Sequence, residues 1–228
     1  LEIPPKNGVT FRFYYLTKLL IKKGLNITVF LCDRGWTSKA KLRKSFPNMH
    51  LFSPKFFYKR TSFVEDVIKS ERVDILQVNN SASVLLFGAR YSQNLHIPLL
   101  TEMHDCDATI KKTLKAMQSD IHLTGFVQYA AGMLSHQIIC MTNRDRHELI
   151  NLGISKSKIN LIPNGIDADY FFYSTPNLKK RRLVFLGNMF YLPNQNSAEL
   201  LIKKVMPRVK AQLICIGMVP DSFKKKYK

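Results

Sequence analysis

The sequence predicts an α/β fold built on a doubly wound parallel sheet. Short apolar runs that are rich in β-branched residues alternate along the chain with stretches of helical length. The first clear case is the amphipathic stretch 11–23, which Gly24 stops just before the apolar run 26–32, NITVFLC. Because almost wholly apolar strands need cover on both faces, this alternation favours a parallel sheet between helices. Further strands are expected at 73–78, 97–103, 137–141 and 158–162, with helices at 62–70, 83–93, 108–134 and 143–151.

The alternation breaks at residues 167–180, where aromatic residues, Pro176 and a basic run have the composition of an interdomain connection. A second unit follows, with a strand at 182–186, a helix at 196–209 and a strand at 211–216. One such unit is too small to bury the core of an independent domain. The predicted organisation is an N-terminal domain over residues 1–170, a linker over 171–181 and the beginning of a C-terminal domain over 182–228.

Composition argues against several classes of protein. The 228 residues are 46% apolar, which supplies enough apolar surface for folding and excludes a disordered chain. The apolar runs are strand-sized, and none approaches the roughly 18 residues that a membrane-spanning helix needs. The four cysteines are widely spaced without a C-x-x-C pair, as in a protein with reduced thiols. A cytoplasmic location is therefore expected.

The chain is strongly basic, with 35 Lys and Arg against 16 Asp and Glu and a net charge of +19. The excess is spread over several clusters, and such clusters most often lie on a solvated face. It is compatible with an anionic membrane surface, nucleic acid or phosphorylated ligands. Since no RNP-like motif, zinc finger or recognition helix accompanies it, no nucleic-acid partner is expected.

In open parallel sheets, ligands bind beyond the carboxyl ends of the strands, so the loops there are the candidate sites. Gly8, before the first helix, either lets the backbone approach a phosphate or sugar closely or simply forms a turn. His104 follows a buried strand, and it either contacts a sugar or is a structural histidine bonded to backbone. Asp105 and Asp107 are expected to cap the next helix, although their D-x-D spacing also suits a divalent cation.

Two later loops complete the set. Asn164 and Gly165 follow a strand in the sequence IPNGID, where Asn-Gly alone explains a tight turn. Gly187 and Asn188 lie where a phosphate would face the second unit, unless this is a plain loop in which Pro193 starts the helix. No dinucleotide fingerprint, P-loop or nucleophile elbow is present, and no two histidines stand at zinc-ligand spacing.

The order of these segments resembles the retaining glycosyltransferases of family 4, which have the GT-B fold. The motifs that carry the resemblance are PPKNG at 4–8, HD at 104–105, SKINLIPNGID at 157–167 and LVFLGNMFYLPN at 183–194. The resemblance implies two Rossmann-like domains that face each other across a cleft. The first domain would bind the acceptor and the second the nucleotide-sugar donor.

The resemblance also implies roles for single residues. His104 would touch the transferred sugar and is the catalytic candidate. Transfer with retention of configuration in this fold needs no metal or other cofactor, because helix dipoles and basic side chains stabilise the leaving diphosphate. The implied function is transfer of a sugar to a glycan or lipid-linked acceptor. The residues expected to bind the donor are Gly8, Asn164, Gly165, Gly187 and Asn188.

The chain departs from the family pattern in ways that leave alternatives. Asn188 and Asn194 occupy the stretch where many relatives carry an Arg and a Lys that grip the diphosphate. The family's first strand would precede residue 4 and its paired glutamates would follow residue 228, so we expect a fragment that is inactive as it stands. The alternatives are a non-catalytic GT-B-like binding protein and a metal-dependent transferase that uses Asp105 and Asp107.

The basic, aromatic stretch 51–63, LFSPKFFYKRTSF, carries one further hypothesis. Lysines beside exposed aromatic side chains suit a lipid headgroup interface, so this stretch could dock the protein peripherally on an anionic membrane. The alternative is a strand followed by a solvated basic loop.

Overall fold

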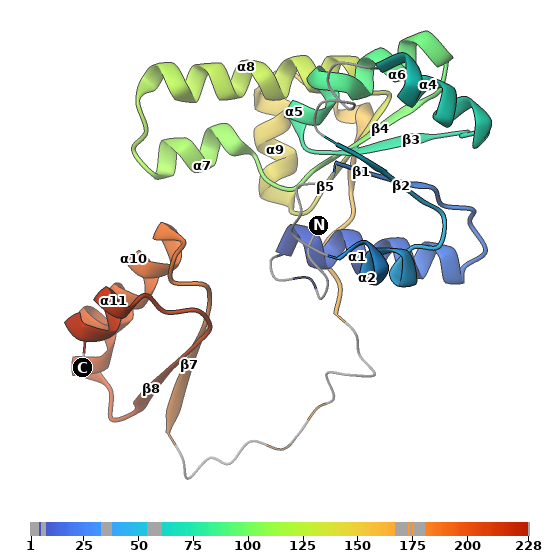
Figure 1. Cartoon of the computed structure of the whole chain (residues 1–228). Helices are drawn as coiled ribbons and strands as arrows, with labels where there is room; N and C mark the ends of the chain where they lie inside the picture. Colours follow the sequence, from blue (N-terminus) through green and yellow to red (C-terminus); the bar gives the residue numbers. More distant parts are fainter. Residues whose placement is uncertain are drawn as a thin grey trace. The chain divides into compact units, whose positions relative to one another are not determined.

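The computed structural model describes residues 5, 8–32, 38–53, 61–166, 173, 175 and 181–227. The chain divides into two compact units, Leu1–Gly165 and Ile166–Lys228. Each unit is built from parallel strands and helices, as the sequence predicts (Figure 1). The linker predicted at 171–181 lies almost wholly outside the described residues, and the assignment of the domains stays a prediction.

Unit 1 contains two parallel sheets in its described part. β1 (Val29–Cys32) pairs with β2 (Met49–Phe52). The second sheet has the order β3-β4-β5-β6, so successive strands are neighbours and all are parallel. Its strands are β3 (Leu76–Asn79), β4 (Leu99–Met103), β5 (Gln137–Cys140) and β6 (Ile159–Leu161).

Helices connect these strands and cover them. In Figure 1, α4, α6 and α8 lie above the strands of unit 1 and α1 and α2 below them. The connections also include a π-helical turn, Val84–Gly88, and a short 3-10 turn, Lys156–Lys158. The α-helices are α1 (Gly8–Lys22), α2 (Lys39–Ser45), α4 (Thr61–Ser70), α5 (Ser81–Ser83), α6 (Ala89–Leu95), α7 (Asp107–Thr113), α8 (Gln118–Leu134) and α9 (Asn143–Asn151).

One apolar core joins the two sheets of unit 1. β5 buries three residues in a row, Ile138 to Cys140, which requires cover on both faces of the sheet. Leu149 of α9 and Val84 are fully buried in the same core, and Phe30 of β1 packs against it. The continuous apolar strands of the sequence are therefore explained by burial from two sides.

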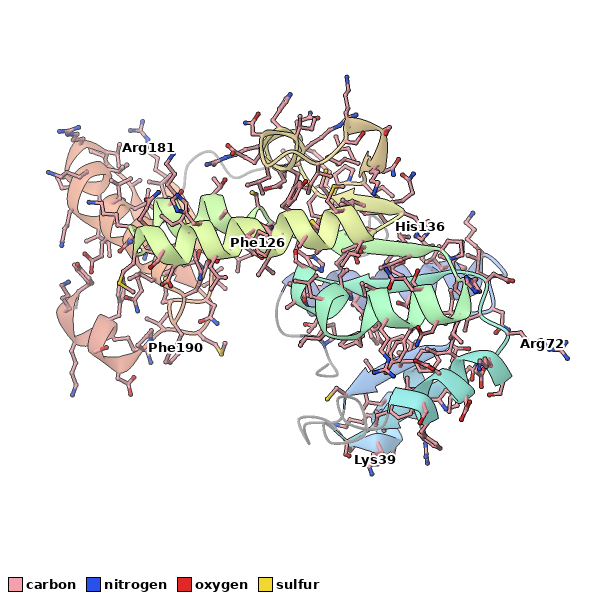
Figure 2. The ribbon with its side chains drawn as sticks, turned by 90° about the horizontal axis from the view of Figure 1, so that it is seen from above. Lys39, Arg72, Phe126, His136, Arg181 and Phe190 are labelled. Atoms are coloured by element: carbon pink, nitrogen blue, oxygen red, sulfur yellow. The ribbon has the colours of Figure 1, made fainter. Side chains whose placement is uncertain are left out.

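Some element boundaries differ from the sequence prediction. The first helix begins at Gly8 instead of residue 11, so Gly8 lies in its first turn. The region 108–134 was predicted as one helical stretch and is two helices, α7 and α8, joined by a turn in which Lys115 has a φ of 56°. His136, labelled in Figure 2, lies between α8 and β5 and accepts the backbone N–H of Leu99 through Nδ1 at 3.0 Å, which joins this segment to β4.

In its described residues, unit 2 contains the parallel pair β7 (Arg182–Leu186) and β8 (Gln212–Ile216), two α-helices, a π-helical segment, Leu201–Val205, and a 3-10 turn, Met206–Arg208. α10 (Leu192–Leu200) begins four residues before the predicted helix because Pro193 suits a first helical turn. α11 (Asp221–Lys226) closes a small core of Met189, Ala198 and Phe223. Among the helices of the described residues, none has the length and apolar character that crossing a bilayer requires.

Candidate functional site

The carboxyl edge of the four-stranded sheet brings together two of the predicted loops. His104 follows β4, and residues 162–165 follow β6 at the same edge because all four strands are parallel. The register pairs Glu102 of β4 with Asn79 of β3, and the carbonyl of Glu102 accepts the N–H of Asn80 at 2.9 Å. The strand order itself therefore brings His104, Asn164 and Gly165 to one edge of the sheet.

Arg12 of α1 ties these loops together. Its Nε donates to Glu102 Oε1, and its Nη1 donates to the carbonyl of Pro163 at 2.9 Å and to Asn164 Oδ1 at 3.1 Å. Gln77 Nε2 donates to the second carboxylate oxygen of Glu102 at 3.3 Å. The first turns of α1, the end of β4 and the loop after β6 are thus joined by one guanidinium group.

This ion pair is buried. The side chains of Arg12 and Glu102 are only 7% and 1% exposed. A buried carboxylate is stable only with a charged partner and hydrogen bonds, and here Arg12 supplies the charge while Gln77 supplies a further donor. Arg12 Nη2 is buried without a hydrogen-bond partner among the described residues, so part of the guanidinium group is still unsatisfied.

Sequence reasoning did not assign a role to Arg12 or Glu102. A signal for Glu102 was present, because an acidic residue near the end of the apolar strand PLLTEM needs a counter-charge if it is buried. A signal for Arg12 was its place inside the aromatic stretch FRFYY. The pairing itself was not readable, because the two residues are 90 positions apart.

His104 lies directly beyond β4. Its Nε2 atom is buried, and no described residue bonds to it. This ring nitrogen therefore has an unused hydrogen-bonding position, as donor or acceptor depending on the tautomer. Contact between His104 and a sugar stays a prediction.

The expectation that Asp105 or Asp107 caps the next helix is wrong. The residue before α7 is Cys106, and no side-chain capping bond is made there. Instead Gln128 of α8 reaches back to this loop: its Oε1 accepts the N–H of Ala108 at 3.2 Å and its Nε2 donates to the carbonyl of Asp105 at 3.0 Å. An amide from a neighbouring helix takes the place of the cap.

The two aspartates lie in an unfavourable electrostatic environment. Desolvation raises the pKa of Asp105, and the nearby carboxylate of Asp145 raises it further, while His104 opposes this. Desolvation also raises the pKa of Asp107, with a second contribution from Asp105. Across the residues that the structure describes, no group of three His, Cys, Asp or Glu side chains is placed to hold a metal ion.

The glycines of this edge border open space. A Cβ atom added to Gly8 or Gly165 would meet no atom within 4 Å. Packing against the protein therefore does not require a glycine at either position, and both leave room for a ligand. Asn164 has a defined structural task, because its Oδ1 accepts from Arg12.

The candidate loop of unit 2 is held by its own asparagines. Asn188 Oδ1 accepts the N–H of Phe190 at 3.0 Å, and the carbonyl of Asn188 accepts from Asn194 Nδ2 at 3.0 Å. A Cβ on Gly187 would lie 3.1 Å from Asn194 Nδ2, so this glycine allows Asn194 to close over the loop. Asn188 and Asn194 shape the loop, and donor binding by Gly187 and Asn188 stays a prediction.

A sequence model of glycosyltransferase family 4 matches residues 6–170, which is most of the chain. The chain belongs to glycosyltransferase family 4. The match covers every candidate residue of the carboxyl edge of unit 1. No curated protein sequence matches this family 4 chain significantly.

Solved structures show the same fold. The apo lipopolysaccharide outer core galactosyltransferase WaaB is 13% identical, with a TM-score of 0.63 over 95% of this chain and 60% of its own. Anabaena HepE in complex with UDP is 16% identical, with a TM-score of 0.58 over 82% of this chain and 53% of its own. A Listeria monocytogenes protein named as a UDP-N-acetylglucosamine 2-epimerase is 15% identical, with a TM-score of 0.52 over 93% of this chain and 60% of its own.

These likenesses confirm the predicted fold class, which is α/β of the GT-B type with parallel sheets. The family 4 chain spans between 53% and 60% of the length of these three structures. At such low identity they establish the fold alone, since one fold supports several chemistries.

Proposed function

We propose that the protein is a nucleotide-sugar-dependent glycosyltransferase that moves a hexosyl group to a glycan or lipid-linked acceptor with retention of configuration. The observation that carries this proposal is the family 4 match over residues 6–170. Unit 1 would be the acceptor-side domain, and unit 2 would belong to the donor-binding domain.

The geometry of the carboxyl edge supports named roles. His104 presents an unpartnered Nε2 atom and would hydrogen-bond the transferred sugar as charge develops in the transition state. Gly8 begins a helix of 15 residues, whose free N–H groups would attract the diphosphate. Asn164 and Gly165 would complete the donor side of unit 1, with Arg12 holding their loop in place.

The donor to test first is a UDP-sugar. HepE binds UDP in its crystal structure, and its fold is shared by this chain. The loop at Gly187 and Asn188 would contact the diphosphate of the donor through its backbone and amide groups. No metal or other cofactor is required by this proposal, since helix N-termini and basic side chains would stabilise the leaving group.

The test is a transfer assay on the full product of the gene that encodes this chain. The 228-residue chain is assayed beside it. We expect transfer from a UDP-sugar with the anomeric configuration retained, as measured by NMR of the product. The His104→Asn variant should lose about 100-fold or more in kcat, as expected for the loss of one group that stabilises transition-state charge. His96→Asn, at an exposed helix end, is the matched control and should keep full activity. The inactivity of the isolated chain stays a prediction.

Each alternative has its own result in this assay. Donor binding without turnover would identify a non-catalytic binding protein. Loss of activity with a chelator, and in Asp105→Asn or Asp107→Asn variants, would identify a metal-dependent transferase. Appearance of an epimerised UDP-sugar without transfer would place the protein beside the Listeria protein in function.

A cytoplasmic, peripheral membrane location also belongs to this proposal. The stretch 51–63 was the predicted docking segment, but its central part, residues 54–60, lies outside the described residues. A lipid-linked acceptor would require that the protein reach a bilayer by some surface.

A further inference from the structure

The α7–α8 hairpin, residues 107–134, has an unusual outer surface for this basic chain. α8 has 17 residues, and only Asp120 among them is charged. The outer side of a surface helix is normally polar. Here the large apolar side chains Leu123, Phe126 and Met133 are 63%, 65% and 51% exposed. Phe126 is labelled near the middle of α8 in Figure 2.

Close packing fixes which side of α8 faces outward. The buried residues of the helix are Gly125, Gln128, Ala131 and Gly132. A Cβ on Gly132 would lie only 2.5 Å from Ile154 Cδ1, so the helix packs closely against the core at this glycine. Phe126 lies outside this buried set and is exposed.

The turn of the hairpin combines apolar and basic side chains. Leu114 and Met117 are 37% and 70% exposed, and Lys115 stands between them. Lys111 and Lys112 lie in the last turn of α7, and residues 108–119 include no acidic residue. Figure 1 shows this turn at the free end of the hairpin, away from the strands of unit 1.

The apolar surface continues into the hairpin. An open pocket of 410 Å³ lies beside α8 and is lined by Ile121, Phe126 and Tyr129 of the helix together with Ala108 and Leu152. Ala108 bonds to Gln128, whose amide also holds the carbonyl of Asp105. The pocket therefore lies beside the first turn of α7, which follows the loop that carries His104.

We propose that the α7–α8 hairpin docks on an anionic lipid bilayer. Met117, Leu123 and Phe126 would enter the headgroup boundary, and Lys111, Lys112 and Lys115 would face anionic lipid headgroups. Lipid fits better than a protein partner because lysine is depleted at the centre of protein interfaces, whereas lysines beside apolar side chains are favoured at bilayers. The inference rests on the peripheral membrane location in the proposed function and names the surface for it, but its test is independent of transfer because lipid binding needs no donor.

Flotation of the full chain with vesicles tests the proposal. Vesicles of phosphatidylcholine with phosphatidylserine should bind the chain, and vesicles of phosphatidylcholine alone should bind it far more weakly. Replacing Lys111, Lys112 and Lys115 by Gln should lower the partition coefficient roughly fivefold for each lysine at low salt. Met117→Gln with Phe126→Gln should lower it about tenfold or more, since two large apolar side chains are removed.

Matched variants keep the test specific. Lys41, Lys44 and Lys69 are three exposed lysines elsewhere in unit 1, and their replacement by Gln removes the same charge. Ile75→Gln and Leu25→Gln remove exposed apolar side chains away from the hairpin. Circular dichroism and thermal unfolding of every variant establish that it is folded.

Binding that is lost in the hairpin variants and retained in the matched variants would support the proposal. Failure of the unaltered chain to float with anionic vesicles would overturn it, as would equal loss in both sets of variants. Self-association of the chain that is abolished by Phe126→Gln, without vesicle binding, would also overturn it and would assign this face to a second copy. A transfer assay with a soluble acceptor is unaffected by any of these results, so the two proposals fail separately.

Discussion

Two glutamates at opposite edges of the unit 1 strands are stabilised in different ways. Glu102, at the carboxyl edge, is 1% exposed and is paired with a single permanent cation, Arg12. Glu71, at the amino edge of the β1–β2 pair, is 22% exposed. Its carboxylate accepts from Thr28 at 3.0 Å, from Asn48 at 3.0 Å and from His50 Nε2 at 2.8 Å.

The difference shows that the burial of a carboxylate decides which kind of partner stabilises it. A carboxylate removed from water depends on its counter-ion, because the uncompensated charge would have to be desolvated alone. A carboxylate that keeps some water can share its lone pairs among several weaker donors. Removing one group should therefore lower the free energy of unfolding strongly at the carboxyl edge and only moderately at the amino edge.

The largest effect is expected from Arg12→Met. Removing the cation leaves Glu102 buried and unpaired, so the free energy of unfolding should fall by about 3–5 kcal/mol. Denaturant unfolding followed by circular dichroism measures this loss. The double variant Arg12→Met with Glu102→Gln should recover at least half of it, because no charge is then buried. A loss below about 1 kcal/mol in Arg12→Met would show that the ion pair is not needed.

A smaller effect is expected at the amino edge. Asn48 Nδ2 donates to Thr28 Oγ1 at 2.6 Å and to Glu71 Oε2 at 3.0 Å, so Asn48→Ala removes two bonds from a partly buried cluster. The free energy of unfolding should fall by about 1–2 kcal/mol, since Glu71 keeps its other donors. Asn94→Ala removes a bond to the carboxylate of Glu65 at the surface and is the control. Equal losses in the two variants would contradict the role of the cluster.

The contribution of Glu71, at the amino edge, to the free energy of unfolding should depend on pH. Hydrogen bonds from Asn48, His50 and Thr28 lower the pKa of Glu71 below its ordinary value of 4.5. A carboxyl whose pKa is lower in the folded state stabilises the fold above its unfolded pKa, and this contribution is lost as the pH falls through the folded pKa. The stability difference between the unaltered chain and Glu71→Gln should thus be constant near neutral pH and shrink below pH 4.5. A difference that persists unchanged to pH 3, or about that value, would contradict the shift.

The smallest effect has the opposite sign and belongs to the carboxyl edge. Because desolvation and Asp145 raise the pKa of Asp105, its charged form is less stable in the folded protein than in the unfolded chain. Asp105→Asn should therefore raise the free energy of unfolding at pH 7 by about 0.5 kcal/mol, a small value because solvent screens the site. Asp66→Asn on α4 is the control. Destabilisation by Asp105→Asn would show that its carboxylate makes a bond that the neutral amide cannot replace.

Much of the fold could be predicted because its helices and strands follow from local sequence patterns. Alternation of apolar runs and helical stretches placed β5, β7 and α9 within a residue of their observed limits. Helix boundaries that depend on a single turn were harder, and the turn at residues 114–117 has no glycine or proline to mark it. The strand predicted at 73–78 begins later in the structure, because β3 starts at Leu76, where its pairing with Leu99 of β4 begins.

The candidate site was predictable only as a set of loops. The rule that ligands lie beyond the carboxyl ends of parallel strands pointed to the loops of Gly8, His104 and Asn164, and the strand order brings the last two to one edge. The contacts that hold this edge come from Arg12 and Gln128, whose partners lie far away in the sequence. No local pattern encodes such pairings, and so capping by Asp105 or Asp107 was expected where Gln128 acts instead.

The span of the Arg12 contacts has a consequence for synthesis of the chain. Arg12 is made 90 residues before Glu102 and 151 residues before Pro163. At translation rates of roughly 5–20 residues per second, its guanidinium group waits roughly 8–30 s for the last of these partners. Until then the nascent chain must keep both charges in water, because neither can be buried alone. A residue of α1 thus helps complete a loop that is synthesised 151 residues later.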